Sequence, residues 1–349
     1  MASNIRLASP DRISLLSNLS TLLASGIPIL DAVSSISEDS KGNLKKILET
    51  LKEDLKQGKN ISASFAGFPL AFDKVTVNLI KAAEGAGTLD ATLKDLRDYT
   101  QKEIEFTDKI KFALIYPALI LILFTAMLLV ILIVVVPKIA TVFSRLKVTL
   151  PLPTRILIIF SNLLLHNTAW VVGGLVIIAV GIFLLYRYKR DLILGLVFSL
   201  PGISTLVRDI DFTHFCRSLY LLLSSGVPIT TALELASQVV VRRQTVIMFA
   251  KAKEMVASGK RFSEGLHNTH GLVPNIMVKL IEAGERSGTL EKSMADVAGY
   301  LDYQVSNRLK ALTTLIEPVL LVVVGLSVGG MMIAIIAPIY GLIGQVGSR

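Results

Sequence analysis

Cysteine is almost absent from this sequence of 349 residues, and charged side chains are scarce. A single cysteine, Cys216, excludes an internal disulfide and a zinc site built on several cysteines. Asp, Glu, Lys and Arg together make up 18% of the residues, whereas roughly 25% is usual in soluble domains. Apolar residues make up 52%. This composition excludes a disordered chain and favours a protein that is part membrane-bound and part soluble.

The signatures of catalysis and of cofactor binding are missing as well. The Gly-Lys pairs in 58–60 and 259–261 lack both the upstream glycine and the Ser/Thr of a phosphate-binding loop. The Gly-Ala-Gly segment 85–87 follows a predicted helix and has no third glycine, so it reads as a turn. Four histidines form no recognisable closed metal site. We therefore expect no enzyme activity, no cofactor and no metal site.

The excess of positive charge is +9, and it is dispersed along the chain. Lysines and arginines balance aspartates and glutamates in 1–111, and the excess lies in 138–167 and 187–310. A nucleic-acid binder would concentrate its charge in one patch with interleaved aromatic residues. We therefore expect no nucleic-acid partner, and we assign the basic residues to the borders of membrane spans.

Three segments are long and apolar enough to cross a bilayer: 112–136, 169–186 and 312–337. The apolar run 192–200 is too short to span and predicts a buried or interfacial helix. Because no apolar stretch opens the sequence, a cleaved signal peptide is not expected. Basic residues that follow the second span and precede the third favour a cytoplasmic N-terminus, although the basic residues of the outer loop, 137–168, argue against it.

The two halves of the chain repeat each other. Residues 22–29 match 222–229 at an offset of 200, and 79–90 match 280–291 at an offset of 201. Each half is thus a soluble module, 11–111 or 208–311, followed by a span, while the middle span has no counterpart. The repeated turn motifs contain Gly26, Pro28, Gly87, Gly226, Pro228 and Gly288.

Apolar residues recur at helical spacing throughout both modules, and no alternating strand pattern stands out. Gly26 suits the left-handed position after a helix, and Pro28 suits the first turn of the next one. A helix that begins at Leu89 is expected to continue through charged residues into the first span. The predicted fold class is all-α: a polytopic membrane protein with three transmembrane helices and two homologous cytoplasmic helical bundles.

The doubled Ser-Gly-x-Pro-Ile and Glu-x-x-Gly-Thr-Leu motifs, with Tyr-Pro at 116–117 and Glu-Pro at 317–318, resemble the type II secretion system F family. These are inner-membrane platform proteins of type II secretion systems and type IV pili, often called GspF or PilC. The resemblance covers nearly the whole chain. It also includes Val-Val-Pro-Lys (135–138), Leu-Pro-Leu-Pro-Thr-Arg (150–155) and Ala-Pro-Ile-Tyr (337–340).

The resemblance implies a non-enzymatic assembly platform in the bacterial inner membrane. Such a platform passes motion from a cytoplasmic hexameric ATPase to pilins or pseudopilins. The expected partners also include other inner-membrane assembly proteins, the lipid bilayer and further copies of the chain. The module starts near Asp11 here, so contacts of the longer N-terminal extension of many family members are in doubt. The sequence does not separate a pilus from a secretion system.

Glu84 and Glu285 occupy equivalent positions and are candidates for coupling to the ATPase, the alternative being carboxylates that cap a helix end. Glu317, at the start of the third span, is a candidate partner of a pilin N-terminus or of a basic group in the platform, unless it only reaches the interface. Gly325 and Gly329 form a small-residue face suited to close helix packing, between copies or within the chain.

Two other functional classes fit parts of the sequence. A small membrane transporter, or a subunit of one, would explain duplicated halves. Three spans are few for a transporter, however, and neither charged residues nor broken helices line a site within the membrane. A receptor-like signalling protein is the other class, but no recognisable sensor or kinase segment is present.

Overall fold

The computed structural model describes residues 5–145, 152–166, 203–267 and 272–346. Most of these residues are helical, and no β-strand occurs among them. The chain divides into two compact units. The first contains Met1–Lys109 with Thr205–Asn307, and the second contains Ile110–Ser204 with Arg308–Arg349. The predicted all-helical class is confirmed.

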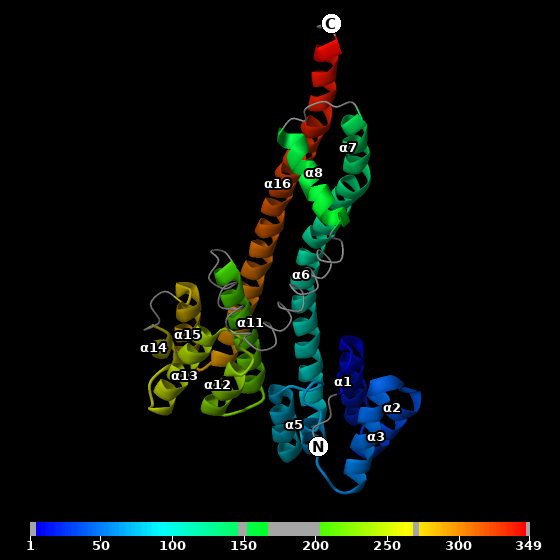
Figure 1. The fold of residues 1–349 in the computed structure, drawn as a ribbon. Coiled ribbons are helices and arrows are strands. Elements are labelled where there is room, and N and C mark those ends of the chain that lie inside the picture. Colours follow the sequence, from blue (N-terminus) through cyan, green and yellow to red (C-terminus); the bar gives the residue numbers. More distant parts are fainter. Residues whose placement is uncertain (1–4, 146–151, 167–202, 268–271, 347–349) are drawn as a thin grey trace. The chain divides into compact units, whose positions relative to one another are not determined.

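The first unit is built from two stretches that lie far apart in the sequence (Figure 1). Its N-terminal half contains α1 (Ser9–Ala24), α2 (Ile29–Asp39), α3 (Gly42–Lys56), α4 (Ile61–Ala66), α5 (Lys74–Ala86) and the start of α6 (Leu89–Val130). Its second half contains α11 (Ile203–Ser224), α12 (Ile229–Ser237), α13 (Arg243–Ala257), α14 (Phe262–His267), α15 (Asn275–Ser287) and the start of α16 (Leu290–Val346).

Apolar side chains from both halves form the core of this unit. In α1 the buried leucines recur at the spacing that places them on one face of a helix: Leu15, Leu16 and Leu19. Aromatic rings fill each half. The rings of Phe65 and Phe72 stack at 4.0 Å, and those of Phe215 and Phe249 stack at 3.5 Å. Both halves therefore contribute stacked aromatic rings to the core of the unit.

The repeated glycines lie where the chain reverses between helices. Gly26 has φ of 80° and Gly226 has φ of 77°, in the left-handed region that glycine adopts without steric cost. Gly87 and Gly288 end α5 and α15 in the same left-handed conformation. Pro28 and Pro228 each stand one residue before the following helix rather than inside its first turn.

Gly284 in α15 marks a close approach to the start of α16. A Cβ atom at this position would lie 2.7 Å from Ser293 Cβ and 3.2 Å from Leu290 Cα. Gly284→Ala should therefore destabilise the packing of α15 on α16, because overpacking costs about 1–3 kcal/mol and exceeds the helix-propensity gain of about 1 kcal/mol. Amide hydrogen exchange of α15 in the full-length protein would measure the loss.

Gly85 in α5 provides the matched control for this prediction. No other atom lies within 4 Å of the position that its Cβ would occupy. Gly85→Ala should slow exchange in α5, because alanine favours the helix by about 1 kcal/mol over glycine. If both substitutions slowed exchange, the close approach at Gly284 would be contradicted.

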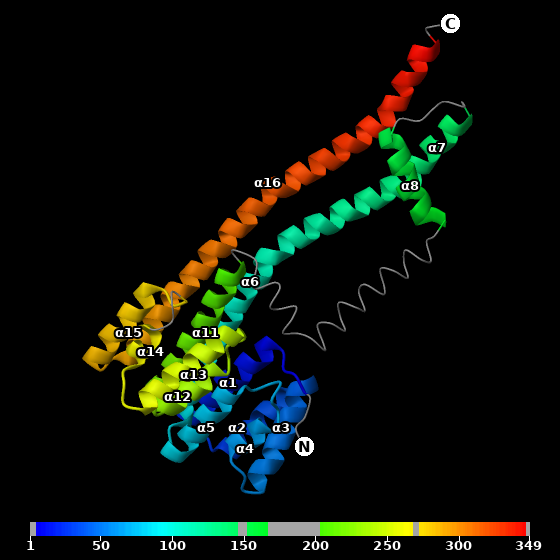
Figure 2. The ribbon, with the colours of Figure 1, turned by 60° about the vertical axis from the view of Figure 1, so that its left-hand side comes forward.

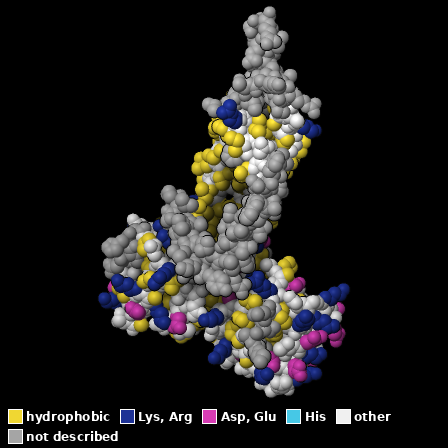
Figure 3. All heavy atoms as spheres, viewed as in Figure 1, with side chains coloured by type: hydrophobic (Ala, Val, Ile, Leu, Met, Phe, Trp, Pro, Cys, Tyr) yellow, Lys and Arg dark blue, Asp and Glu magenta, His cyan; other side chains and the backbone are white. Residues whose placement is uncertain are grey.

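Among the residues that the structure describes, two helices contain stretches long and apolar enough to cross a membrane, α6 and α16 (Figures 1 and 2). α6 runs without interruption from Leu89 through Pro117, as expected, and α16 continues through Pro318. Their apolar side chains are largely exposed, Phe112 by 68% and Leu326 by 73%. Most of the charged side chains visible in Figure 3 lie on the first unit, and hydrophobic ones gather on the second.

The segment 137–168 was expected to be a connecting loop but is largely helical. It contains α7 (Val136–Arg145) and α8 (Leu152–His166). Between α6 and α7 the chain forms a π-helical turn, η1 (Ile131–Val135), and Ser161 of α8 donates a hydrogen bond of 2.7 Å to the Leu132 carbonyl there. Pro137 lacks the N–H that would bond to residue 133, and the wider π turn accommodates this defect.

The middle predicted span, 169–186, and the short apolar run 192–200 lie outside the described residues. Three spans and a cytoplasmic N-terminus therefore stay predictions, as does the duplication of the two modules.

Candidate functional site

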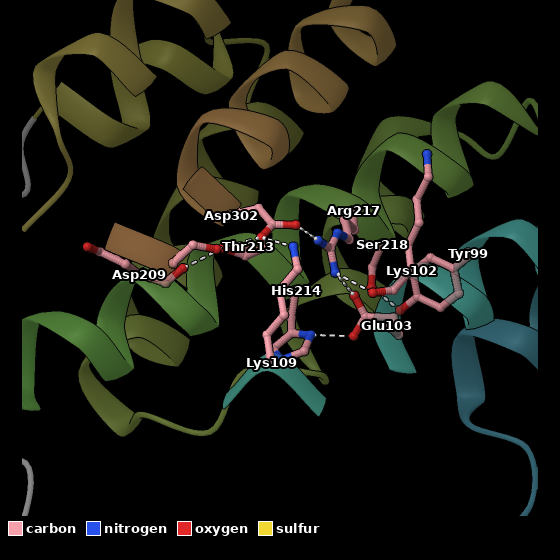
Figure 4. Close-up of polar contacts among 11 residues, drawn as sticks. Tyr99, Lys102, Glu103, Lys109, Asp209, Thr213, His214, Arg217, Ser218 and Asp302 are labelled. Carbon is pink, nitrogen blue, oxygen red and sulfur yellow. Dashed lines mark hydrogen bonds and ion pairs between the residues drawn. The ribbon is translucent and has the colours of Figure 1, made fainter. Parts of the chain in front are cut away.

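A cluster of charged side chains joins the two halves of the first unit (Figure 4). We call it the junction: Tyr99, Glu103, Phe106 and Lys109 on α6, His214, Arg217 and Ser218 on α11, and Asp302 on α16. The residues of α6 lie more than 100 positions from those of α11 in the sequence. The junction is thus a product of the tertiary fold.

Arg217 occupies the centre of the junction. Its Nη1 donates to Glu103 Oε1 at 2.9 Å, and its Nη2 donates to Asp302 Oδ2 at 2.7 Å. The guanidinium also lies 4.7 Å from the centre of the Phe106 ring, within the range of a cation–π contact. Only 10% of the Arg217 side chain is exposed. One arginine on α11 therefore binds α6 and α16 at the same time.

The remaining contacts surround this arginine. His214 Nδ1 hydrogen-bonds to Glu103 Oε2, and its ring meets Phe106 edge-on. Lys109 reaches Asp302 Oδ1 at 3.1 Å, which is a direct ion pair between α6 and α16. The hydroxyl groups of Tyr99 and Ser218 hydrogen-bond at 2.9 Å. Both carboxylates of the junction are thus engaged through both of their oxygens.

Electrostatics favour the charged form of Glu103. Burial on its own would raise the pKa of this carboxyl. The hydrogen bonds and charges of His214 and Arg217 outweigh burial, so the pKa of Glu103 is lowered below its ordinary value of 4.5. Burial raises the pKa of the Tyr99 hydroxyl and of the thiol of Cys216, the residue before Arg217 on α11, so both stay protonated. The junction therefore holds a carboxylate, and neither of these two groups is an available nucleophile.

The lowered pKa of Glu103 predicts an acid-dependent loss of stability. A carboxyl with a depressed pKa in the folded protein stabilises it above pH 4.5, and this contribution disappears as the pH falls through the folded value. Glu103→Gln should destabilise the protein at pH 7, and the difference from wild type should shrink steadily between about pH 5 and pH 3. Thermal midpoints of the two full-length proteins in one detergent would measure it.

Asp211 also contributes to the dependence of stability on pH. Burial raises the pKa of this carboxyl above 3.8, so its effect on stability has the opposite sign and is lost as the pH rises through the folded value. Both proteins contain Asp211, and its effect cancels in the difference. A difference that stayed constant down to pH 3 would contradict the assigned state of Glu103.

A cavity of about 420 Å³ lies beside the junction within the first unit. Its walls come from α6, α11 and α16 and include Tyr99, Lys102, Tyr220, Leu221, Ala298 and Gly299. Arg217, Lys109 and Asp302 of the junction line the same space. In this part of the unit, open volume therefore separates side chains of α6 from those of α16.

Glu84 and Glu285 lie elsewhere in the unit and cap short helices. Glu84 accepts hydrogen bonds from Ile61 N at 2.5 Å and Ser62 N at 3.2 Å, at the start of α4. Glu285 accepts them from Phe262 N at 2.5 Å and Ser263 N at 3.0 Å, at the start of α14. Carboxylates at a helix N-terminus satisfy donors that have no partner within the helix. The structure thus places both glutamates as helix caps, the role that the sequence left open beside coupling to the ATPase.

Glu317, Gly325 and Gly329 lie on the apolar part of α16. Glu317 is exposed, and it precedes Pro318 inside the continuous helix. No atom of the described residues lies within 4 Å of the position that a Cβ would occupy at Gly325 or Gly329. These three residues belong to the second unit and the two capping glutamates to the first, so each stays a separate candidate.

The junction is not among the sites predicted from the sequence, although the sequence contains a signal of it. At the offsets of 200 and 201, the charged residues Glu103, His214, Arg217 and Asp302 correspond to Gln304, Ser14, Ser17 and Gln101. At each of these four pairs of positions, one half thus has a charged or titratable side chain and the other half has a neutral one. Within the described residues, no group of three or more His, Cys, Asp or Glu is arranged to hold a metal ion.

Comparison with known proteins gives consistent matches over most of the chain. A family model described as type II secretion system (T2SS), protein F, matches residues 15–137 and 215–338. The type IV pilus assembly protein PilC of Myxococcus xanthus is 28% identical over 93% of this chain and 79% of its own length. PilC of Pseudomonas aeruginosa is 28% identical over 94% and 89%. The type II secretion system protein F of the same organism is 30% identical over 93% and 80%.

Proposed function

The chain belongs to the type II secretion system F family, and from this membership we propose that it is a non-enzymatic assembly platform of the bacterial inner membrane. In this role it couples a cytoplasmic hexameric ATPase to the assembly of pilins or pseudopilins into a filament. The observation that carries the proposal is the double match of the family model, which covers both halves and the long apolar helices that follow them.

The continuity of α6 and α16 supports a mechanical role. Each helix begins among the charged helices of the first unit and continues without a break into an apolar stretch. An α-helix rises about 1.5 Å per residue and is held by its own hydrogen bonds, so a displacement of its soluble end reaches its membrane part. The junction adds a second link, because it holds α6, α11 and α16 together.

In-cell cross-linking tests this proposal. A tagged full-length protein is cross-linked in cells that are building filaments, solubilised in a mild detergent and purified with its partners. We expect a secretion-type ATPase and pilin-like subunits to co-purify, and the identity of the pilin to decide between a pilus and a secretion system. Recovery of neither would contradict the platform and favour the small transporter, which substrate flux into liposomes would then test.

Glu317 is the candidate contact within the membrane. An ionisable group in an apolar helix is costly and is often retained for function. We propose that it pairs with the positive N-terminus of a processed pilin or with a basic group of the platform. Glu317→Gln should then lower filament assembly at equal protein level in the membrane, as measured by immunoblot and by counting filaments. Normal assembly by this variant would remove Glu317 from the mechanism.

A further inference from the structure

Next to the junction, open space separates side chains of α6 from those of α16, so polar side chains link the two helices at this level. The cavity of about 420 Å³ has Lys102 of α6 on one wall and Gly299 of α16 on another. A void provides no packing contacts across it. The bridge across this region consists of Arg217, which binds carboxylates on both helices, and of the direct Lys109–Asp302 ion pair.

Arg217 is suited to fix that spacing. Its guanidinium is planar and presents its donors in a rigid fork, so the two carboxylates that it binds are held at set directions. Its side chain is nearly buried, and the Phe106 ring packs against the guanidinium. Because removing one member of a buried ion pair leaves its partner unpaired, separation of the helices at this point is strongly disfavoured.

The two halves of the chain differ at these charged positions. A charge cluster that each half needed for its own fold would be expected in both copies. The positions equivalent to Arg217, Glu103 and Asp302 are instead the neutral Ser17, Gln304 and Gln101. The charged cluster is therefore a feature of the joint between the halves and not of the fold that they share.

We propose that Arg217 is a positioning residue that makes α6 and α16 move as one body, so that a displacement of either half reaches both apolar helices together. This inference rests on the proposed platform function and adds to it how the two halves are coupled. The competing view is a joint that must open in each assembly cycle. The two views predict opposite effects of a permanent link between the helices.

A covalent bridge between α6 and α16 distinguishes the two views. Lys102 is exposed, and a Cβ at Gly299 would meet no atom within 4 Å apart from the backbone of its own helix. Cysteines are therefore introduced at both positions of the full-length protein by Lys102→Cys and Gly299→Cys. The native Cys216 is buried, and burial raises the pKa of its thiol, so bis-maleimides react at the introduced sites. The control pair, Lys102→Cys with Glu105→Cys, places both thiols on α6.

Filaments are then counted on cells that lack the native protein and express each variant. We expect the protein cross-linked between positions 102 and 299 to assemble filaments as well as the same protein without reagent. Arg217→Met should lower assembly by at least about tenfold. In Arg217→Met, the bridge between positions 102 and 299 should restore filament assembly, whereas the control bridge within α6 should not. Arg217→Lys, which keeps the charge but not the fork, should give an intermediate value.

Two results would overturn the inference. The first is loss of filament assembly by the cross-linked protein that retains Arg217, which would mean that the joint must open. The second is normal assembly by Arg217→Met. The first measurement does not require any junction variant to fold. Failure of the platform proposal looks different, because the unmodified protein would then recover neither ATPase nor pilin after cross-linking in cells.

Discussion

Glu285→Ala should open the start of α14 and raise its amide exchange rates by roughly 30- to 700-fold. The Glu285 carboxylate accepts the backbone N–H groups of Phe262 and Ser263, both in a part-buried setting. Hydrogen bonds to a charged acceptor contribute about 1.5–3 kcal/mol each, and water can replace part of that at a half-exposed site, which leaves a cost of about 2–4 kcal/mol. Hydrogen exchange with mass spectrometry on the full-length protein measures the change peptide by peptide.

Glu84→Ala provides the internal control. This carboxylate caps α4 through Ile61 N and Ser62 N and also accepts from the Ser62 hydroxyl. Its removal should speed exchange in α4 and leave α14 unchanged, while Glu285→Ala should do the reverse. Unchanged exchange in α14 of the Glu285 variant would contradict the capping role.

The same variants can separate capping from coupling to the ATPase. Gly284→Ala is expected to loosen α15 next to Glu285 without removing the carboxylate. If Glu285→Ala lowers filament assembly and Gly284→Ala lowers it equally at matched loss of stability, capping explains the effect. A selective loss with Glu285→Ala would support the coupling role that we propose for this carboxylate.

Local features of the fold could be predicted because local physics determines them. The left-handed turns at Gly87 and Gly288 follow from the absence of a Cβ, and the buried stripe of α1 follows from apolar spacing. The segment 152–166 was predicted as part of a loop, but it forms α8. This helix packs against η1 and α7, and such contacts depend on the tertiary fold.

The junction could not be predicted from local pattern. A histidine, an arginine and two acidic residues on three separate helices have no characteristic spacing, and each on its own reads as a solvated helix residue. Their meeting depends on how the two halves pack, which is a property of the tertiary fold. The sequence holds one signal of the junction: at the offset of 200, the neutral Ser17 corresponds to Arg217.

Arg217→Met should destabilise the first unit by up to about 3–5 kcal/mol, the cost of leaving a buried charge without any partner. This value is an upper limit, because Glu103 keeps His214 and Asp302 keeps Lys109 as basic partners. The methionine fills part of the volume beside Phe106 but donates no hydrogen bond, so Glu103 and Asp302 each lose a charged donor. Exchange in the middle of α11 and in the adjoining turns of α6 should rise, while α4 and α14, which do not contact the junction, stay as in wild type.

A triple variant tests whether unpaired charge causes this loss. Adding Glu103→Gln and Asp302→Asn to Arg217→Met replaces both carboxylates with neutral amides, as in the Gln304 and Gln101 of the other copy. Because a buried charge without a partner costs more than a neutral group at the same place, the triple variant should be more stable than Arg217→Met alone. A triple variant that is less stable would mean that packing by the arginine stem dominates. The triple variant also distinguishes stability from coupling. Even if its stability recovers, it lacks the guanidinium that holds α6 and α16 at one spacing, so its filament assembly should stay low.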